Sequence, residues 1–535
     1  MKLQRFLLII ISIISSIAVV TAQQPADSAA QNINNIIHAD RIGLLKTDTA
    51  DFQTLAGNVK VQQGKSLFYC DSASINTSQN VLESFGHVHI NDADSVHIYS
   101  EYLKYKGKEK IANLNRNVKL TDGQGILTTP SLQYDMNTKI ATYTEGGKIV
   151  DGKTTLTSKD AKYYEITRDV YFRKNVVLID PQYTITTDTL LYNTSSNIAT
   201  FVAPTNITSD SSRKKIITTD GYYDTKNKKA YFGKRSQIQD GSTFLIADEL
   251  ANDDSTGFGE ARGNVIYNDT QQHVMIIANN LKSNNKEKSF LATQNPVMIL
   301  KQQEDSIFIS ADTMYSARLT YLRKFRTIPK VLDSLPRSDS TLTDDDSANR
   351  FFEAYYHVKI YSDSMQAVGD SMFYSAFDSV FRLFKNPVMW ARDNQVTGDT
   401  IYLFTKDKKP QRMYVFENAL AINKVGNNYY NQVKGRTING YFIDGNIDNM
   451  RAKGNAESIY YAQDEENKFI GVNHATSDII DMYFLEKKPE RVVFRSSLQG
   501  TMSPMRQVKH DEMRLKNFQW LEDRRPKTKY DIFGN

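Results

Sequence analysis

The stretch Ile185-Thr186-Thr187-Asp188-Thr189-Leu190-Leu191-Tyr192 shows the unit from which most of this chain is built. An apolar residue and a small residue precede an acid, called the anchor below, and an apolar residue follows two positions later. About 18 residues after the anchor, the unit closes on Asn-Val or a close variant. The same pattern then starts again, so internal repetition is the first property that a fold must explain.

Two columns of residues define the repeat. The anchors follow one another at 28 to 33 residues, apart from one step of 58, and are Asp40, Asp71, Glu101, Pro130, Lys159, Asp188, Asp220, Asp248, Asn279, Asp312, Asp370 and Asp399. The closing residues are Val59, Val88, Val118, Ile149, Val176, Ile207, Ile238, Val265, Val297, Val358, Val388 and Leu420. Units of roughly 29 residues in a chain of 535 predict one array that grows by stacking.

Inside each unit the apolar residues recur with a period of two, and β-branched and aromatic residues are favoured. This pattern predicts strands, so the expected fold is all-β, an elongated solenoid of about 12 to 14 stacked repeats. Apolar or small residues at minus three, minus one and plus two from the anchor cannot share one face of a straight strand. The chain is therefore expected to bend or bulge at every anchor, where an acid caps the corner.

The alternation also predicts which side chains point inward. In the first half of the array these are Val59, Val61, Val88, Ile90, Ile98, Val118, Leu120, Leu127, Ile149, Leu156, Val176, Leu178 and Ile185. The same rule places Val297 and Ile299, and Val388 and Trp390, inward. Such a ladder fits a filled core and an open apolar trough equally well, so the sequence leaves both open.

The N-terminus predicts a secretory signal. Lys2 and Arg5 precede the apolar run 6–20, and Ala22 ends a small-residue cleavage pattern. An uncleaved anchor is the alternative, although about 15 apolar residues are short for a membrane span of about 20. We therefore expect a signal peptide at 1–22 and a linker at 23–37.

The array is expected to occupy 38–429, with an exposed insertion within 317–350 that is rich in Ser, Asp and Arg. Residues 430–502 keep the composition but lose the period, as degenerate end units do. The charged segment 503–535 could form a short helix. It is expected either to cap the array in solvent or to dock on a partner or on anionic headgroups.

Sites for chemistry are scarce. Formal net charge is +5 with both signs interspersed, which does not indicate nucleic-acid binding, and the lone Cys70 excludes an intramolecular disulfide. His87, His89 and His97 lie close in sequence, but no cysteine or recurrent acid completes a metal set, so no metal and no cofactor is expected. Nucleotide-binding loops and a hydrolase nucleophile elbow are missing from the sequence.

Tyrosines recur four residues after the anchor, at Tyr105, Tyr134, Tyr163, Tyr192 and Tyr374. Packing is favoured over a sugar-binding platform for such a stacked aromatic edge. The anchor acids could line a catalytic groove, as in β-solenoid polysaccharide lyases. Their recurrence in most units favours a structural role, because a catalytic set is usually a single local cluster.

Units such as Gly86-His87-Val88-His89-Ile90, Ala247-Asp248-Glu249-Leu250 and Arg262-Gly263-Asn264-Val265-Ile266-Tyr267 resemble the OstA-like, or LptA-like, periplasmic family of lipopolysaccharide transport. The resemblance covers about residues 35–500 and implies a stacked β-jellyroll, or β-slide, whose apolar interior holds acyl chains. The thirteen inward residues above would line this path. The chain is longer than the simple bridge component, and we expect it to lack the large barrel that follows the repeat in the outer-membrane member.

The resemblance implies a non-enzymatic periplasmic carrier or bridge for lipopolysaccharide or a related glycolipid, working toward the outer membrane. Its implied partners are other jellyroll proteins of the inner-membrane transporter and the outer-membrane translocon. Open solenoid ends also predict end-to-end self-association. Two rivals remain: a secreted β-solenoid hydrolase or lyase, and a structural or adhesive solenoid with a dry, filled interior.

Overall fold

The computed structural model describes residues 35–47, 51–211, 213–302, 305–327, 343, 348–406, 409–486 and 488–533. These residues form forty strands, β1 to β40, together with one four-residue α-helix and three 3-10 helices. The all-β class is therefore confirmed. The expected signal peptide, most of the expected linker, and residues 328–342 and 344–347 of the expected insertion lie outside the described residues.

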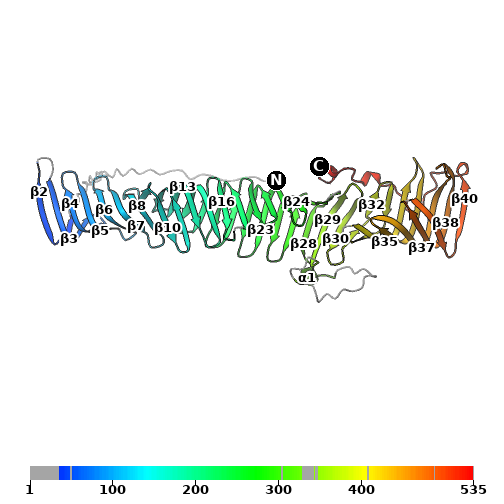
Figure 1. Ribbon diagram of the computed structural model, residues 1–535, viewed down its shortest axis with the longest axis horizontal. Coiled ribbons are helices and arrows are strands. Elements are labelled where there is room, and N and C mark those ends of the chain that lie inside the picture. The colour runs from blue at the N-terminus through cyan, green and yellow to red at the C-terminus, as the bar shows by residue number, and fades with distance from the viewer. Residues whose placement is uncertain are drawn as a thin grey trace, which may run out of the picture. The chain divides into compact units, whose positions relative to one another are not determined.

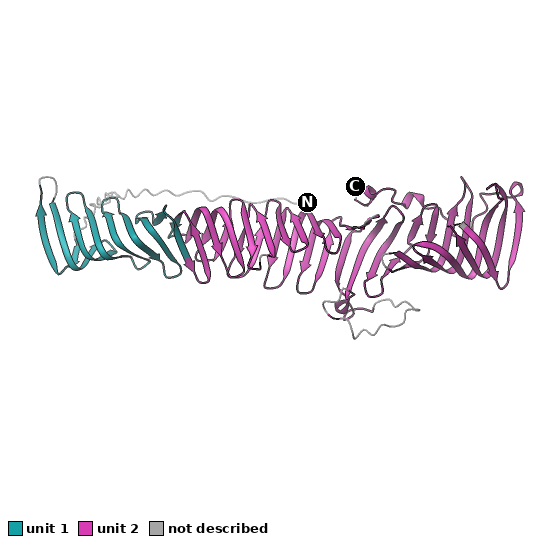
Figure 2. Ribbon diagram, viewed as in Figure 1, with its two compact units in different colours: residues 1–149, 162–166 teal, residues 150–161, 167–535 magenta. Residues whose placement is uncertain are grey.

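The chain divides into two compact units (Figure 2). Unit 1 comprises residues 1–149 and 162–166, and unit 2 comprises residues 150–161 and 167–535. The expected boundaries near residues 430 and 503 remain predictions. Within each unit, strands pair in antiparallel fashion either with the next strand or with one that is two or three strands further along the chain (Figure 1).

The strands of unit 1 are β1 (Asn35–His38), β2 (Arg41–Lys46), β3 (Asp51–Gln63), β4 (Ser66–Asn76), β5 (Val81–Asp92), β6 (Val96–Lys106), β7 (Ile111–Thr121), β8 (Ile126–Asp135) and β9 (Ile140–Tyr143). Two strands, β10 (Gly147–Asp151) and β12 (Asp160–Tyr164), have residues in both units.

Unit 2 begins with β11 (Thr154–Ser158), β13 (Asp169–Ile179), β14 (Tyr183–Asn193), β15 (Ile198–Phe201), β16 (Thr205–Ser209), β17 (Lys214–Thr218), β18 (Gly221–Asp224), β19 (Lys229–Phe232), β20 (Ser236–Asp240), β21 (Thr243–Ala247), β22 (Glu249–Asp253), β23 (Phe258–Asp269), β24 (Val274–Asn284), β25 (Ser289–Thr293), β26 (Val297–Leu300), β27 (Ile307–Ser310), β28 (Thr313–Arg318) and α1 (Leu319–Leu322).

It continues with β29 (Arg350–Tyr361), β30 (Gln366–Ser375), β31 (Val380–Phe384), β32 (Val388–Ala391), β33 (Asn394–Thr397), β34 (Thr400–Lys406), β35 (Lys409–Lys424), β36 (Tyr430–Ile443), β37 (Asn446–Gln463), β38 (Phe469–Leu485), β39 (Lys488–Arg495) and β40 (Gln499–Pro504). The 3-10 helices η2 (Met505–Gln507), η3 (Glu522–Arg524) and η4 (Lys529–Ile532) follow.

Each hairpin has two arms, as β5 and β6 illustrate. Residues 81–85 pair with 102–106 in the arm that carries the plus-four tyrosine, called the tyrosine arm. Residues 88–92 pair with 96–100 in the arm that carries the closing valine, called the valine arm. Each repeat of this hairpin pattern is called a rung below. The pairing register shifts between the two arms, and in this rung the shift falls between Phe85 and Val88. Equivalent shifts recur in both units, which confirms the expected bulge at the anchor.

The bulge explains the Gly-Asn-Val signature. Gly57 and Asn58 both have positive φ, 80° and 46°, a conformation that glycine and asparagine adopt more readily than other residues. A Cβ atom on Gly57 would collide with the Asp40 carboxylate, so the close approach of the anchor also requires glycine here. The Val59 side chain then begins the inward face of the valine arm.

The start of the expected insertion is not an exposed loop. After β28, the short helix α1 buries Leu319 and Leu322 against Phe351 and Phe373. The side chain of Asn349 accepts a hydrogen bond from the backbone N–H of Thr320 at 2.9 Å, which fixes the point where the chain returns to β29.

Candidate functional site

All nine predicted inward residues of unit 1 are buried, with at most 5% of each side chain exposed. Their pairing aligns six side chains in one row across the valine arms, because directly opposed residues of antiparallel strands share a face. The row reads Val61, Phe68, Ile90, Ile98, Leu120 and Leu127. Phe68 was not among the predicted residues, although it lies at minus three from its anchor like Ile98 and Leu127.

The four predicted inward residues of unit 2 are Leu156, Val176, Leu178 and Ile185, and they are also buried. A row through Leu178 and Ile185 continues along the following strands of unit 2. Its members are Leu156, Leu178, Ile185, Ile207, Ile216, Ile238, Leu245, Tyr267, Ile276, Met298, Ile309, Ile360, Ala367, Met389, Val396, Ala421 and Val433.

The prediction that Val297, Ile299, Val388 and Trp390 point inward is wrong. Ala367, which shares the inward face with Ile360, is paired with Met389, so Val388 and Trp390 point outward. The two positive-φ residues of the bulge here precede Pro387 rather than the valine, and this shifts the alternation by one. The same shift at Pro296 turns Val297 and Ile299 outward and Met298 inward.

The interior is packed at most of these positions. Exposed fractions of 0 to 5% at the thirteen predicted residues mean that neighbouring side chains, rather than solvent, surround them. Cover is incomplete at two places in the inward row of unit 2, because Ile238, Leu245 and Tyr267, and further along Val396 and Ala421, are only half-buried. The carrier hypothesis therefore needs the two arms to separate where an acyl chain enters.

Side chains close the interior by linking the ends of the two arms. Tyr105, Tyr134, Tyr163 and Tyr192 are buried, as packing requires, and each hydroxyl bonds a polar residue 41 or 42 positions earlier in the chain. These four partners are Gln63, Asp92, Asp122 and Asp151. We call this column of bonds the tyrosine seam.

Asp92 is the best-connected residue of the seam. Its carboxylate accepts hydrogen bonds from Tyr134 at 2.7 Å and Ser66 at 2.7 Å, and it forms an ion pair with Lys139. The Tyr134 hydroxyl also lies 2.6 Å from Glu165 Oε2. Burial by itself would raise the pKa of Asp92, but bonds from Lys139, Ser66 and Tyr134 outweigh it and lower that pKa.

Unit 2 contains bonds of the same kind. Asp151 accepts hydrogen bonds from Tyr192 and Asn197, both at 3.0 Å, and Lys228 lies 3.0 Å from the buried Asp180. Burial raises the pKa of Tyr192 to about 12, so its hydroxyl keeps its proton and acts as a donor at neutral pH.

The anchor acids form structural pairs across the bulge. Asp71 lies 2.8 Å from His87 Nδ1, and Asp248 accepts a bond from Asn264 at 2.8 Å. Related pairs join Asp40 to Asn58, Glu101 to Asn117, Asp312 to His357 and Asp399 to Asn418. The anchor acids were expected to cap a turn by bonding their own backbone. They instead bond the side chain of a residue in the bulge of the facing strand.

The three clustered histidines separate. His87 contacts Asp71, whereas His89 Nε2 lies 3.1 Å from His97 Nδ1 and its ring stacks on Tyr99 at 4.5 Å between centroids. Within the described residues, no group of three His, Cys, Asp or Glu side chains is placed to hold a metal ion.

The C-terminal segment 505–533 packs against the outward face of unit 2 instead of extending into solvent. Gln432 Oε1 accepts the Leu515 N–H at 2.8 Å, and its Nε2 donates to the Met513 carbonyl at 2.9 Å. Gln395 makes the same pair of bonds to the Leu521 N–H and the Gln519 carbonyl, at 2.7 and 2.6 Å.

These contacts cover an apolar outward surface. Leu515 packs with a cluster that includes Leu420, Ile422, Tyr430, Ile459, Tyr461 and Val472. Leu521 packs against Val368, Val388 and Trp390. At the other end of the segment, Phe533 lies with its ring centroid 6.3 Å from that of Phe308.

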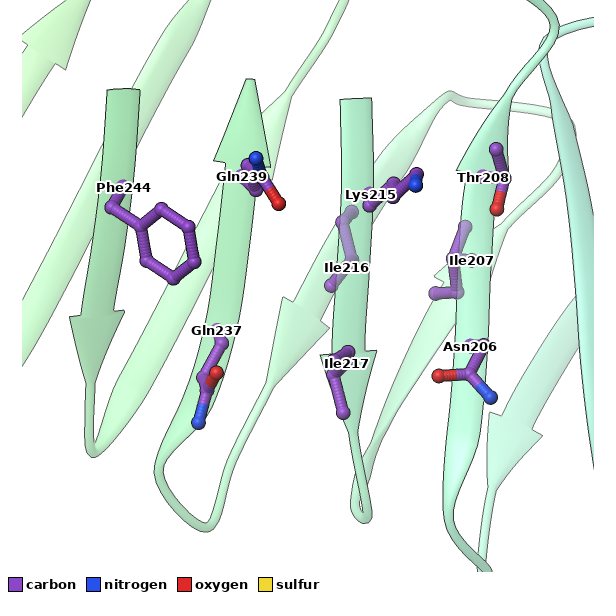
Figure 3. A pocket seen from close by; sticks show the side chains of 9 residues that line it. All are labelled: Asn206, Ile207, Thr208, Lys215, Ile216, Ile217, Gln237, Gln239 and Phe244. Atoms are coloured by element: carbon purple, nitrogen blue, oxygen red, sulfur yellow. The ribbon is translucent and has the colours of Figure 1, made fainter. Parts of the chain in front are cut away.

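A hollow of about 270 Å³ lies on the outward face of β16, β17, β20 and β21 (Figure 3). The outward side chains of Ile217, Gln237, Gln239 and Phe244 line it, together with Asn206, Thr208 and Lys215. Taking Asp220 as the anchor places Ile217 at minus three, which is an inward position. Ile217 is instead 53% exposed, so the anchor assignment in this unit is displaced by one residue. Its neighbour Ile216 takes the inward position.

No helix among the described residues is long and apolar enough to cross a bilayer. No curated protein matches the sequence. Residues 32–188 and 174–248 match the model of the OstA-like protein family, over the rungs that carry the thirteen predicted inward residues and the tyrosine seam. The resemblance drawn from the repeat is thus confirmed over residues 32–248, which match the OstA-like family, and from residue 249 onward it stays a prediction.

Proposed function

We propose that this protein is a periplasmic carrier or bridge for lipopolysaccharide or a related glycolipid, folded as a stacked β-jellyroll and acting without catalysis. Acyl chains would lie between the tyrosine and valine arms, against Val59, Val61, Val88, Ile90, Ile98, Val118, Leu120, Leu127, Ile149, Leu156, Val176, Leu178 and Ile185. The family match supports a role in lipopolysaccharide transport.

One arrangement carries the proposal. An aliphatic inward row recurs rung after rung, and the ends of the tyrosine and valine arms are linked by side-chain hydrogen bonds and not by backbone hydrogen bonds between strands. Each methylene moved from water into such a row contributes about 0.8 kcal/mol. A seam of the Tyr134–Asp92 kind can open without breaking a strand ladder, because its bonds lie outside the paired backbone. Ile238, Leu245 and Tyr267 are among the inward positions where cover is already partial, because they are only half-buried.

The proposed protein partners are other jellyroll proteins of the transport path, joined end to end. The first strands of unit 1 support this proposal. β2 pairs with β3, the described residues supply no strand for its other edge, and Leu44 on it is 81% exposed. An unpaired apolar edge is a ready template for another strand.

A closed structural solenoid is the second candidate, favoured by the dry packing of the inward residues. Photoreactive residues at 88, 118 and 176, with outward position 119 as the matched control, separate the two candidates in mature protein taken from its periplasm. A carrier would crosslink glycolipid at the three inward positions and not at 119. A lipid-free protein with no crosslinked lipid would favour the structural solenoid.

A further inference from the structure

The outward face of unit 2 carries a continuous row of side chains along which the C-terminal segment lies. Strand pairing defines this row, called the outer row, as Lys215, Gln239, Phe244, Asn268, Met275, Ile299, Phe308, Tyr361, Gln366, Trp390, Gln395, Ile422, Gln432 and Ile459. The segment contacts it at Gln432, Gln395, Gln366 and Phe308. One row therefore guides the whole segment.

Two positions of the outer row bind the segment in the same way. At Gln432 and at Gln395, the side-chain amide binds the N–H of a leucine and the carbonyl of the residue two positions earlier. Each glutamine thus offers the segment one hydrogen-bond donor and one acceptor, as the edge of a strand would. The leucine side chain then packs on the apolar neighbours, as Leu515 does with 4% exposure.

The described part of the C-terminal segment covers only part of the row. Its last described residue, Phe533, lies on Phe308. Beyond Phe308 the outer row continues through Ile299, Met275 and Phe244 to Gln239. Gln239 is exposed and pairs with an aromatic neighbour, Phe244, as Gln395 pairs with Trp390.

We propose that the hollow around Gln239 binds a leucine-bearing extended segment of a partner protein, in the way that Gln395 and Gln432 bind this chain's own C-terminal segment. Gln239 would bind the backbone N–H of the leucine and the carbonyl two residues before it. The leucine side chain would fill the hollow between Ile217 and Phe244, which are 53% and 37% exposed. The partner is thus another polypeptide, because a polypeptide supplies this pair of backbone groups.

The test uses a fluorescein-labelled peptide with the sequence of residues 511–523 as the probe and the full mature chain as the receptor. Fluorescence anisotropy should show saturable binding that weakens at least tenfold in Gln239→Ala and in Ile217→Asp. Gln133→Ala, a change at an exposed glutamine of unit 1, is the matched control and should leave binding unchanged. Circular dichroism melting curves check that each variant folds.

Two outcomes would overturn the proposal. Binding that is insensitive to Gln239→Ala but increases when Leu521→Asp weakens the resident segment would place the peptide at Gln395 and Gln432. The absence of saturable binding to the unaltered chain would remove the site altogether. Self-association is checked by sedimentation: a dimer that persists in Gln239→Ala but is lost when 505–535 is deleted would assign the contact to exchange between copies.

Discussion

The rungs of unit 1 and the C-terminal rungs of unit 2 follow one repeat but are closed on opposite faces. In unit 1, buried tyrosines and acids close the inside, and the outward face carries Lys60, Tyr69, His89, Tyr99 and Lys119 in one paired row. In the C-terminal rungs, a covering segment packs on an apolar outward face.

The size of the side chains in the inward row also differs between these two regions. In unit 1 it is built of Val61, Phe68, Ile90, Ile98 and Leu120, whereas the C-terminal rungs carry smaller residues such as Ala367 and Ala421 on the equivalent row. The difference teaches that a single pairing scheme can be closed from the inside or from the outside. Under the proposed function the first rungs would hold an apolar ligand between the arms, whereas the last rungs hold a peptide segment on the outside.

The largest expected effect comes from breaking the outward cover. Leu515→Asp places a carboxylate where a buried leucine packs, so it should cost about 4 kcal/mol or more and release the segment. Both tryptophans of the chain, Trp390 and Trp520, lie at this contact, so their emission should shift to the red. Lys516→Asp, on an exposed neighbour, should change neither stability nor emission.

Tyr134→Phe should break the seam while sparing the outward cover. It removes the hydroxyl shared by Asp92 and Glu165 and should destabilise unit 1 by about 1 to 3 kcal/mol. Hydrogen exchange should quicken in β5 and β8, with tryptophan emission unchanged. Tyr99→Phe, at a ring that is 40% exposed, serves as the control; an equal loss in both variants would contradict a special role for the seam.

The seam should also weaken in acid. The folded pKa of Asp92 lies below its ordinary value of 3.8, so the fold favours the charged carboxylate. Its stabilising contribution is complete above that value and is lost as the pH falls through the lower, folded pKa. Urea unfolding of unit 1 should therefore occur at lower concentration at pH 3 than at pH 6. Asp92→Asn should flatten this dependence, and a slope retained in that variant would assign it to other groups.

The smallest expected effect is at the anchors. Asp71→Ala removes the contact with His87, but both side chains are mostly exposed, so the loss of stability should stay below about 1 kcal/mol. Thermal unfolding measures it, with Lys108→Ala at an exposed turn as the control. A loss of several kcal/mol would show that the bulge depends on this pair far more than its exposure suggests.

Much of the fold followed from local patterns. Alternation placed Val88, Ile90 and Ile98 on the inward face, and the offsets of apolar and small residues around the anchor located the bulge, because both depend on neighbouring residues. The same reasoning failed at Val388 and Trp390. There the positive-φ pair precedes a proline, and a shift of one residue turns every following side chain to the other face.

The sequence by itself determined the all-β class, the repeat and most of the inward face, since these are properties of a few adjacent residues. Tertiary structure decided which distant residues meet. Tyr134 reaches Asp92 from 42 positions away, and Gln395 binds Leu521 from 126 positions away. The spacing of such pairs follows from how rungs stack and how the arms face each other, which no local pattern encodes.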